Sequence, residues 1–107
     1  MKKAFVIEEK DNVGTVVIEP ISQGEQVGTY GRVKDVTMTA NQDIPYGHKI
    51  ALRDIPKGET IWKYGLSIGN AIEDIKAGDH VHVHNIESNR GRGDKAASVE
   101  QPQGFSA

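Results

Sequence analysis

The chain has no cysteine among its 107 residues, which excludes disulfide bonds, zinc-thiolate sites and a cysteine nucleophile. It also lacks a long apolar run. The N-terminal stretch MKKAFVIEEKDN has four consecutive apolar residues before acidic residues return, and that run is too short for a secretory signal or a membrane span. We therefore expect a cytoplasmic protein that does not associate with membranes.

An excess of charge of either sign is missing too. The 13 lysines and arginines stand against 15 aspartates and glutamates, giving a formal net charge of −2, so no basic field for nucleic acid is present. The length fits one domain with one modest core. Nor does the chain contain a nucleophile elbow, a phosphate-binding glycine loop or a recognisable pair of catalytic carboxylates. Any catalysis is therefore expected to take place beside another chain.

Helical periodicity is absent, because no window sustains apolar residues at positions i, i+3, i+4 and i+7. Short β-branched runs interrupted by glycine replace it, and they predict a mainly β domain. The expected strands are Ala4–Ile7, Val13–Ile18, Glu25–Tyr30, Val33–Thr39, Lys49–Arg53, Thr60–Tyr64, Leu66–Ala71 and Asp79–Ile86.

A weak internal repeat organises these strands. Three of its four units follow an aspartate (Asp43, Asp54 and Asp74), whose carboxylate is expected to accept a hydrogen bond from the backbone just ahead, while the glycine supplies a positive φ. Repeated anchors and tight turns predict a compact, sharply bent structure with little room for an internal pocket. The alternative is a set of unrelated loops that share common turn residues. The units, each Ile-x-x-Gly-x-x-aliphatic, are Ile21–Val27, Ile44–Ile50, Ile55–Ile61 and Ile75–Val81.

The composition changes after Ser88, where glycine, serine, glutamine and charged residues dominate. We expect a single domain over residues 1–88 and a flexible polar tail over residues 89–107. Within the tail, Arg90 and Arg92 are candidates for binding a carboxylate or an acidic partner surface. The alternative is a tail that is simply solvated.

Three of the four histidines lie in the stretch GDHVHVHNIES. Side chains alternate along a strand, so His80, His82 and His84 are expected on one face, with Val81 and Val83 towards the core. Three interpretations remain open for this face: a polar outer surface, a surface turned towards a substrate or partner, and a metal site. Same-face neighbours are about 7 Å apart, and imidazoles suit zinc or iron(II).

The fourth histidine, His48, follows a turn glycine and precedes Lys49. Two donors beside a tight turn can bind an anionic group, although both residues could equally be polar loop residues. Trp62, Lys63 and Tyr64 are expected to be sheet surface and core rather than a binding site.

An ordered series of motifs resembles the small SAF-type domain of the altronate and galactarate dehydratase family. The resemblance covers residues 1–94 and is looser over Pro20–Thr39. Its motifs are Lys10-Asp11-Asn12-Val13, Gly47-His48-Lys49-Ile50-Ala51-Leu52-Arg53-Asp54-Ile55, Gly58-Glu59, Lys63-Tyr64-Gly65, Ile68-Gly69 with Ala71, Ile75-x-Ala77-Gly78, and His80-Val81-His82-Val83-His84-Asn85.

The resemblance implies a β-clip fold, in which short strands fold back sharply on themselves. It also implies a lyase subunit that dehydrates a sugar acid such as altronate by β-elimination, beside a separate large catalytic subunit. A divalent metal, iron(II) or manganese, is expected to be held mainly by that large subunit. The isolated chain is expected to be inactive, and a homo-oligomer is a further option.

On this interpretation His48, His82 and His84 are the candidate catalytic residues, and His82 and His84 are weaker candidates for metal ligands. The candidate substrate-binding residues are Lys49, Asn85, Arg90 and Arg92. Three alternatives stay open: the small subunit of a sulfolactate sulfo-lyase, a non-catalytic carbohydrate-binding or assembly module, and a small metal-binding protein.

Overall fold

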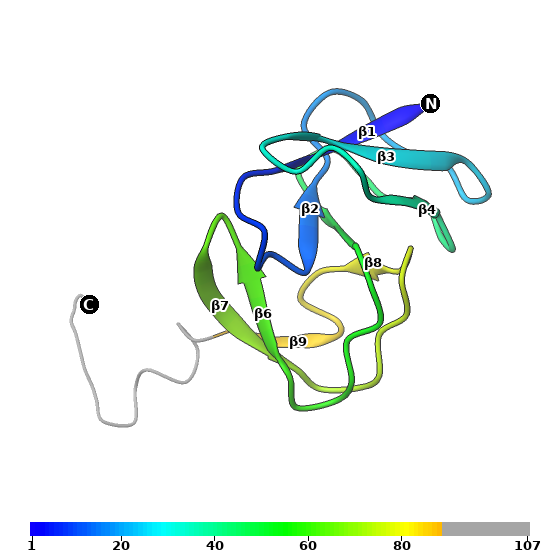
Figure 1. Ribbon diagram of the computed structural model, residues 1–107. Coiled ribbons are helices and arrows are strands. Elements are labelled where there is room, and N and C mark those ends of the chain that lie inside the picture. Colours follow the sequence, from blue (N-terminus) through cyan, green and yellow to red (C-terminus); the bar gives the residue numbers. More distant parts are fainter. Residues whose placement is uncertain (89–107) are drawn as a thin grey trace.

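The computed structural model describes residues 1–88, which form nine strands in two sheets (Figure 1). The mainly β architecture predicted from the sequence is confirmed, and this part of the chain contains no helix that could cross a membrane. The strands are β1 (Lys2–Val6), β2 (Val13–Thr15), β3 (Gln26–Gly31), β4 (Thr37–Thr39), β5 (Lys49–Ala51), β6 (Thr60–Lys63), β7 (Leu66–Ala71), β8 (His80–Val81) and β9 (Ile86–Ser88).

The larger sheet has six strands in the order β4-β3-β1-β2-β5-β8, and the smaller has three in the order β6-β7-β9. All strand pairs are antiparallel except β1 with β3. Figure 1 shows the β6–β7 hairpin near β2, with β1, β3 and β4 at the opposite end of the molecule. The last strand of the larger sheet, β8, has only two residues.

The four repeat units pair two by two. Ile21 and Ile44 exchange backbone hydrogen bonds of 3.0 and 2.8 Å, and Ile55 and Ile75 exchange bonds of 2.7 and 2.8 Å. Each isoleucine is followed by a tight turn whose glycine has a φ of between 86 and 92°, a conformation that favours glycine. The sequence repeat is therefore a structural repeat of apolar anchor and glycine turn.

The aspartates before these isoleucines correct one expectation. Asp43 accepts a hydrogen bond from the Gln23 N–H, at 2.8 Å, and so binds the turn of the paired unit rather than its own. Asp54 and Asp74 do the same in the second pair, accepting from the N–H groups of Ala77 and Lys57 at 2.9 Å. The cause is the antiparallel bridge between the isoleucines, which places the residue before one isoleucine beside the turn after the other.

Two clusters of buried side chains form the core. One includes Ile21, Ile44 and Ile50 and packs on one face of the larger sheet. The other includes Ile55, Ile61 and Ile75 and fills the space between the larger sheet and the β6–β7 hairpin. The isoleucines of the repeat thus supply the centre of both clusters.

The expected strand Asp79–Ile86 is interrupted, and this is the main error in the predicted elements. The chain leaves β8 after Val81, turns through residues 82–85 and re-enters a different sheet as β9. Val81 is fully buried as expected, but Val83 is 77% exposed and does not face the core. The buried Asn85 causes the break, because it binds backbone groups on the other side of the turn. Four further strands are also shorter than expected, namely Val13–Ile18, Val33–Thr39, Lys49–Arg53 and Thr60–Tyr64.

We expect Gly78→Ala to destabilise the fold much more than Gly24→Ala. Both glycines have a φ near 90°, so each alanine costs about 1–2 kcal/mol in backbone strain. A Cβ at residue 24 meets no atom within 4 Å, whereas one at residue 78 overlaps the Thr39 carbonyl oxygen, adding about 1–3 kcal/mol of overpacking. Urea denaturation measures both free energies of unfolding, and equal losses would contradict this packing.

Candidate functional site: a stacked histidine cluster

All four histidines gather at the edge of the larger sheet formed by β5 and β8. The antiparallel register pairs Lys49 with Val81 and Ile50 with His80, and continuing it by one residue brings His48 next to His82. The imidazole rings of His48 and His82 are 3.7 Å apart between centroids and inclined by 9°. They are therefore stacked face to face.

The other two histidines extend this stack. The Nδ1 of His48 and the Nε2 of His80 are 2.8 Å apart and hydrogen bonded, so one ring nitrogen donates its proton and the other accepts it. The ring of His84 is 4.9 Å from that of His80, and His84 lies at the exposed rim. The four rings form one continuous cluster.

Burial and repulsion between charges lower the proton affinity of two histidines of the cluster, His80 and His82. Desolvation, followed by repulsion from His84, His48, His82 and Lys49, lowers the pKa of His80 to about 4. Desolvation and the charges of His48, Lys49 and His84 also lower the pKa of His82. His80 and His82 are therefore neutral imidazoles at pH 7, and each retains a lone pair that can accept a proton.

Asn85 holds the histidine turn in shape rather than facing a substrate. The side chain is 3% exposed. Its oxygen accepts the His82 N–H at 3.0 Å, and its nitrogen donates to the His80 carbonyl oxygen at 2.9 Å. The residue expected to contact substrate is thus a positioning residue for His80 and His82.

Lys49 is the first residue of β5. Its side chain is directed to the face opposite that of Ile50 and His80, because side chains alternate along a strand. Its register partners are Thr15 on β2 and Val81 on β8. Burial, followed by repulsion from Lys63, lowers the pKa of Lys49.

Comparison with known proteins shows the family to which this chain belongs. The family model described as "Altronate/galactarate dehydratase SAF domain" matches residues 2–89. The chain belongs to this SAF-domain family. The family relationship inferred from the ordered motifs is therefore confirmed.

Curated relatives fall into two groups. The chain is 38% identical over 89 residues to a (2R)-sulfolactate sulfo-lyase subunit alpha of Chromohalobacter salexigens, covering 80% of this chain and 95% of the relative. It is 42% identical to an altronate dehydratase of Bacillus subtilis and 47% identical to one of Escherichia coli, covering 83% and 74% of this chain. It spans only 17% and 15% of those two dehydratases.

The SAF fold thus brings together three residues that were singled out from the sequence: His48, His82 and His84. It also adds His80, which the prediction left out of the catalytic set. The equal spacing of the three C-terminal histidines was a signal for His80, but the hydrogen bond to His48 depends on the pairing of β5 with β8. Arg90 and Arg92 lie outside the described residues, as does the expected tail over residues 89–107.

The geometry of the cluster does not suit a metal ion. Within residues 1–88, no group of three or more histidine, cysteine, aspartate or glutamate side chains is arranged to hold one. Stacked rings direct their nitrogens along nearly parallel planes rather than towards one point, and the hydrogen bond between His48 and His80 uses one nitrogen of each ring. His82 and His84 are therefore not supported as ligands within a site built by this chain.

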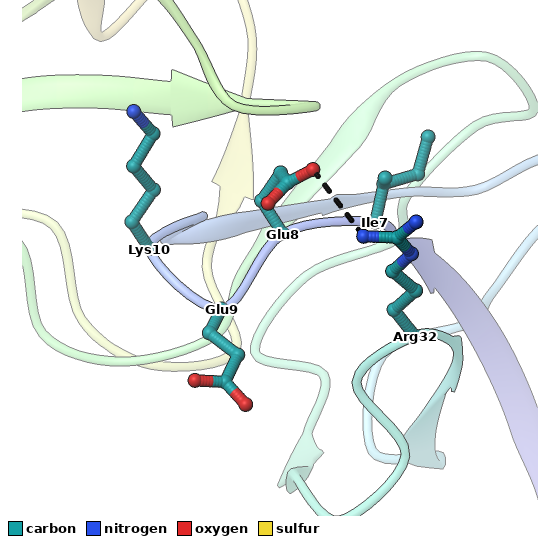
Figure 2. A pocket seen from close by; sticks show the side chains of 5 residues that line it. All are labelled: Ile7, Glu8, Glu9, Lys10 and Arg32. Carbon is teal, nitrogen blue, oxygen red and sulfur yellow. Dashed lines mark ion pairs between the residues drawn. The ribbon is translucent and has the colours of Figure 1, made fainter.

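A pocket of about 560 Å³ lies on another part of the surface (Figure 2). Figure 2 shows the Glu8 and Arg32 side chains directed towards each other, with 3.9 Å between the charged atoms, while Glu9 and Lys10 extend in different directions. Acids and bases balance here, and no histidine lines the pocket. The histidine cluster is therefore the stronger candidate for chemistry. The lining residues are Ile7, Glu8, Glu9, Lys10 and Arg32.

We expect His80 to stay neutral well below the ordinary range of histidine. The imidazole should titrate with a midpoint of about 4 in an NMR pH titration, rather than near 6.5. The unfolded chain takes up this proton below about pH 6.5 and the folded chain does not, so the free energy of unfolding should fall as the pH drops from 6.5 to 4. His80→Asn should flatten this dependence. A midpoint near 6.5 for His80 would contradict the packed cluster.

Asn85→Ala should destabilise the protein by about 1–3 kcal/mol, because it leaves the His82 N–H and the His80 carbonyl oxygen without their partner. Val83→Ala in the same turn is the matched control. Val83 is exposed, so its truncation should change the free energy of unfolding by less than about 0.5 kcal/mol. Urea denaturation of both variants decides between a structural Asn85 and one that is free to bind substrate.

Proposed function

We propose that this chain is the small subunit of a hydro-lyase that dehydrates a sugar acid such as altronate, together with a separate large catalytic subunit. The stacked histidine cluster carries the proposal, because it supplies neutral imidazoles at the protein edge in a family of dehydratases and related lyases. The altronate dehydratases extend far beyond the SAF domain. We assign the remaining machinery to the large subunit, in a cytoplasmic enzyme.

β-Elimination needs two proton transfers. A base removes the proton from the carbon next to the carboxylate, and the electrons of that C–H bond form the new C=C bond as the neighbouring C–O bond breaks. The departing hydroxide takes a proton from an acid and leaves as water. A neutral imidazole can act as the base and an imidazolium as the acid, each accelerating its step by about 10²–10⁴-fold.

The geometry suggests different roles for the four histidines. A group with a pKa of about 4 is a weak base at neutral pH, so His80 is better suited to orienting His48 through their hydrogen bond. His48, His82 and His84 are the proposed proton carriers at the face shared with the large subunit. The iron(II) or manganese ion implied by the family is assigned to the large subunit, since the described residues do not form a metal site.

A sulfolactate sulfo-lyase subunit is the second candidate, favoured by identity across 95% of a curated sulfo-lyase subunit alpha. The first step is the same removal of a proton next to the carboxylate. The second differs, because the C–S bond breaks and its electrons leave with sulfite. Sulfite is a stable anion, so this departure needs no proton from a histidine.

His82→Ala should lower the turnover of altronate by about 10²–10⁴-fold when the chain is combined with its large partner. Lys57→Ala, in an exposed turn, is the control and should leave turnover unchanged. Unchanged turnover in His82→Ala would remove this residue from the site. Activity on sulfolactate but not on altronate would favour the second candidate. If the isolated chain binds a sugar acid but adding it to the large partner does not change turnover, the chain is a non-catalytic module.

A further inference from the structure

Two tight turns meet at the stacked pair of His48 and His82. One turn is closed by the His48 N–H, which donates to the Pro45 carbonyl oxygen at 3.1 Å. The other is closed by the Asn85 N–H, which donates to the His82 carbonyl oxygen at 3.2 Å. The last residue of the first turn thus stacks on the first residue of the second, with 3.7 Å between the ring centroids. The two turns are therefore neighbours beside the histidine cluster.

Each turn has a large, mostly apolar side chain at its second position, and both side chains are exposed. Tyr46 is 62% exposed in the first turn, and Val83 is 77% exposed in the second. Tyr46 lies two residues before His48, and Val83 directly follows His82. Because consecutive Cα atoms are about 4 Å apart, each of these residues lies within about 8 Å of a stacked histidine. Two exposed apolar side chains thus adjoin the cluster.

The sequence repeat shows that the turn itself does not require an aromatic side chain. The four repeat turns share one backbone form, with a glycine of φ between 86 and 92° at the third position. Their second positions are occupied by Gln23, Tyr46, Lys57 and Ala77. Tyrosine therefore occurs only in the repeat turn that adjoins the histidines, although glutamine and lysine serve the same backbone elsewhere. Tyrosine is enriched at protein interfaces, where its ring supplies apolar contact area.

Both turns are held firmly from outside, which fixes the direction of their exposed side chains. The Gly47 N–H donates to the Val16 carbonyl oxygen at 2.7 Å. In the second turn the buried Asn85 side chain accepts the His82 N–H and donates to the His80 carbonyl oxygen. A contact surface on a rigid support loses little conformational freedom when a partner binds. The two turns are thus prepared for docking.

We propose that Tyr46 and Val83, here called the two-turn surface, are the docking site for the large catalytic subunit. The identity of this partner rests on the proposed function, which assigns the remaining machinery to that subunit. Docking here brings the partner directly beside the rings of His48 and His82. The proposed proton carriers therefore face the substrate site of the large subunit when the two chains are assembled.

The curated altronate dehydratases favour the large subunit over a second copy of this chain as the occupant. The chain spans only 17% and 15% of those two proteins, so their SAF domain is joined to a much larger remainder. Tyr46 and Val83 are uncharged side chains. The complementary surface of the partner should therefore be apolar at its centre, with polar groups at the rim.

The first test is the affinity of the whole chain for its purified large subunit, measured by isothermal titration calorimetry. Tyr46→Gln combined with Val83→Gln should weaken this affinity by at least about tenfold, because both side chains lose their apolar contacts. Leu66→Gln is the matched control and should leave the affinity unchanged. Leu66 is 67% exposed but belongs to the smaller sheet.

The double variant should fold, since glutamine already occupies the equivalent turn position at Gln23, and its urea midpoint checks this. If that midpoint falls, Tyr46→Lys alone, which copies the turn of Lys57, takes its place in the affinity measurement. Equal affinities of the wild-type, variant and control chains would overturn the proposal. Sedimentation analysis of the isolated chain adds a second way to reject it. Self-association that the variant abolishes, with an unchanged affinity for the large subunit, would assign the surface to a second copy of this chain instead.

Turnover measured against the concentration of this chain separates the docking surface from the proposed function. The double variant should need an at least about tenfold higher concentration for half-maximal turnover, whereas His82→Ala should lower the maximum itself. An unchanged half-maximal concentration in the double variant, with a lowered maximum in His82→Ala, would overturn the surface but retain the lyase. Weaker docking of the double variant, without activity of the assembly on altronate or sulfolactate, would retain the surface but contradict the proposed function.

Discussion

The reciprocal pairing of isoleucines is the interaction on which the remaining structure depends. Ile21 pairs with Ile44 and Ile55 with Ile75 through two backbone hydrogen bonds each, and all four side chains are buried. Burial of the isoleucine side chains fixes the position of each repeat unit, and the backbone hydrogen bonds fix the direction in which its chain runs. The N–H of each turn glycine then donates to a carbonyl oxygen in a neighbouring segment. Each turn is therefore oriented from two sides, and so is the strand that begins after it.

Strand β5 shows how the orientation of a turn decides which side chains reach the histidine cluster. It begins directly after the Gly47 turn, and the two-residue period of a strand separates its side chains. His48 and Ile50 face one core cluster and the imidazoles, whereas Lys49 faces Thr15 and the β6–β7 hairpin. The Gly47 turn thereby places two adjacent residues, His48 and Lys49, on opposite faces of the sheet.

Local patterning predicted much of this fold. Alternation of β-branched residues with glycine turns indicated a β domain, and the repeat indicated its four anchors. The prediction of one continuous strand over Asp79–Ile86 was wrong. The Asn85 side chain forms hydrogen bonds with the backbone of His80 and His82, and these replace hydrogen bonds between strands. Asparagine often competes with regular structure in this way. The outward orientation of Val83 depends on that one side chain, so alternation alone could not predict it.

The sequence by itself determined the β class, the anchors and turns, and the family, and it singled out His48, His82 and His84 as candidates, because these depend on residue type and local spacing. Only the tertiary structure decided that His80 bonds His48 across 32 residues and that Asn85 is buried against the backbone of His80 and His82. The first of these contacts joins segments far apart in the chain. Both follow from strand register and sheet packing, which are set by the burial of the whole core rather than by any single stretch of residues.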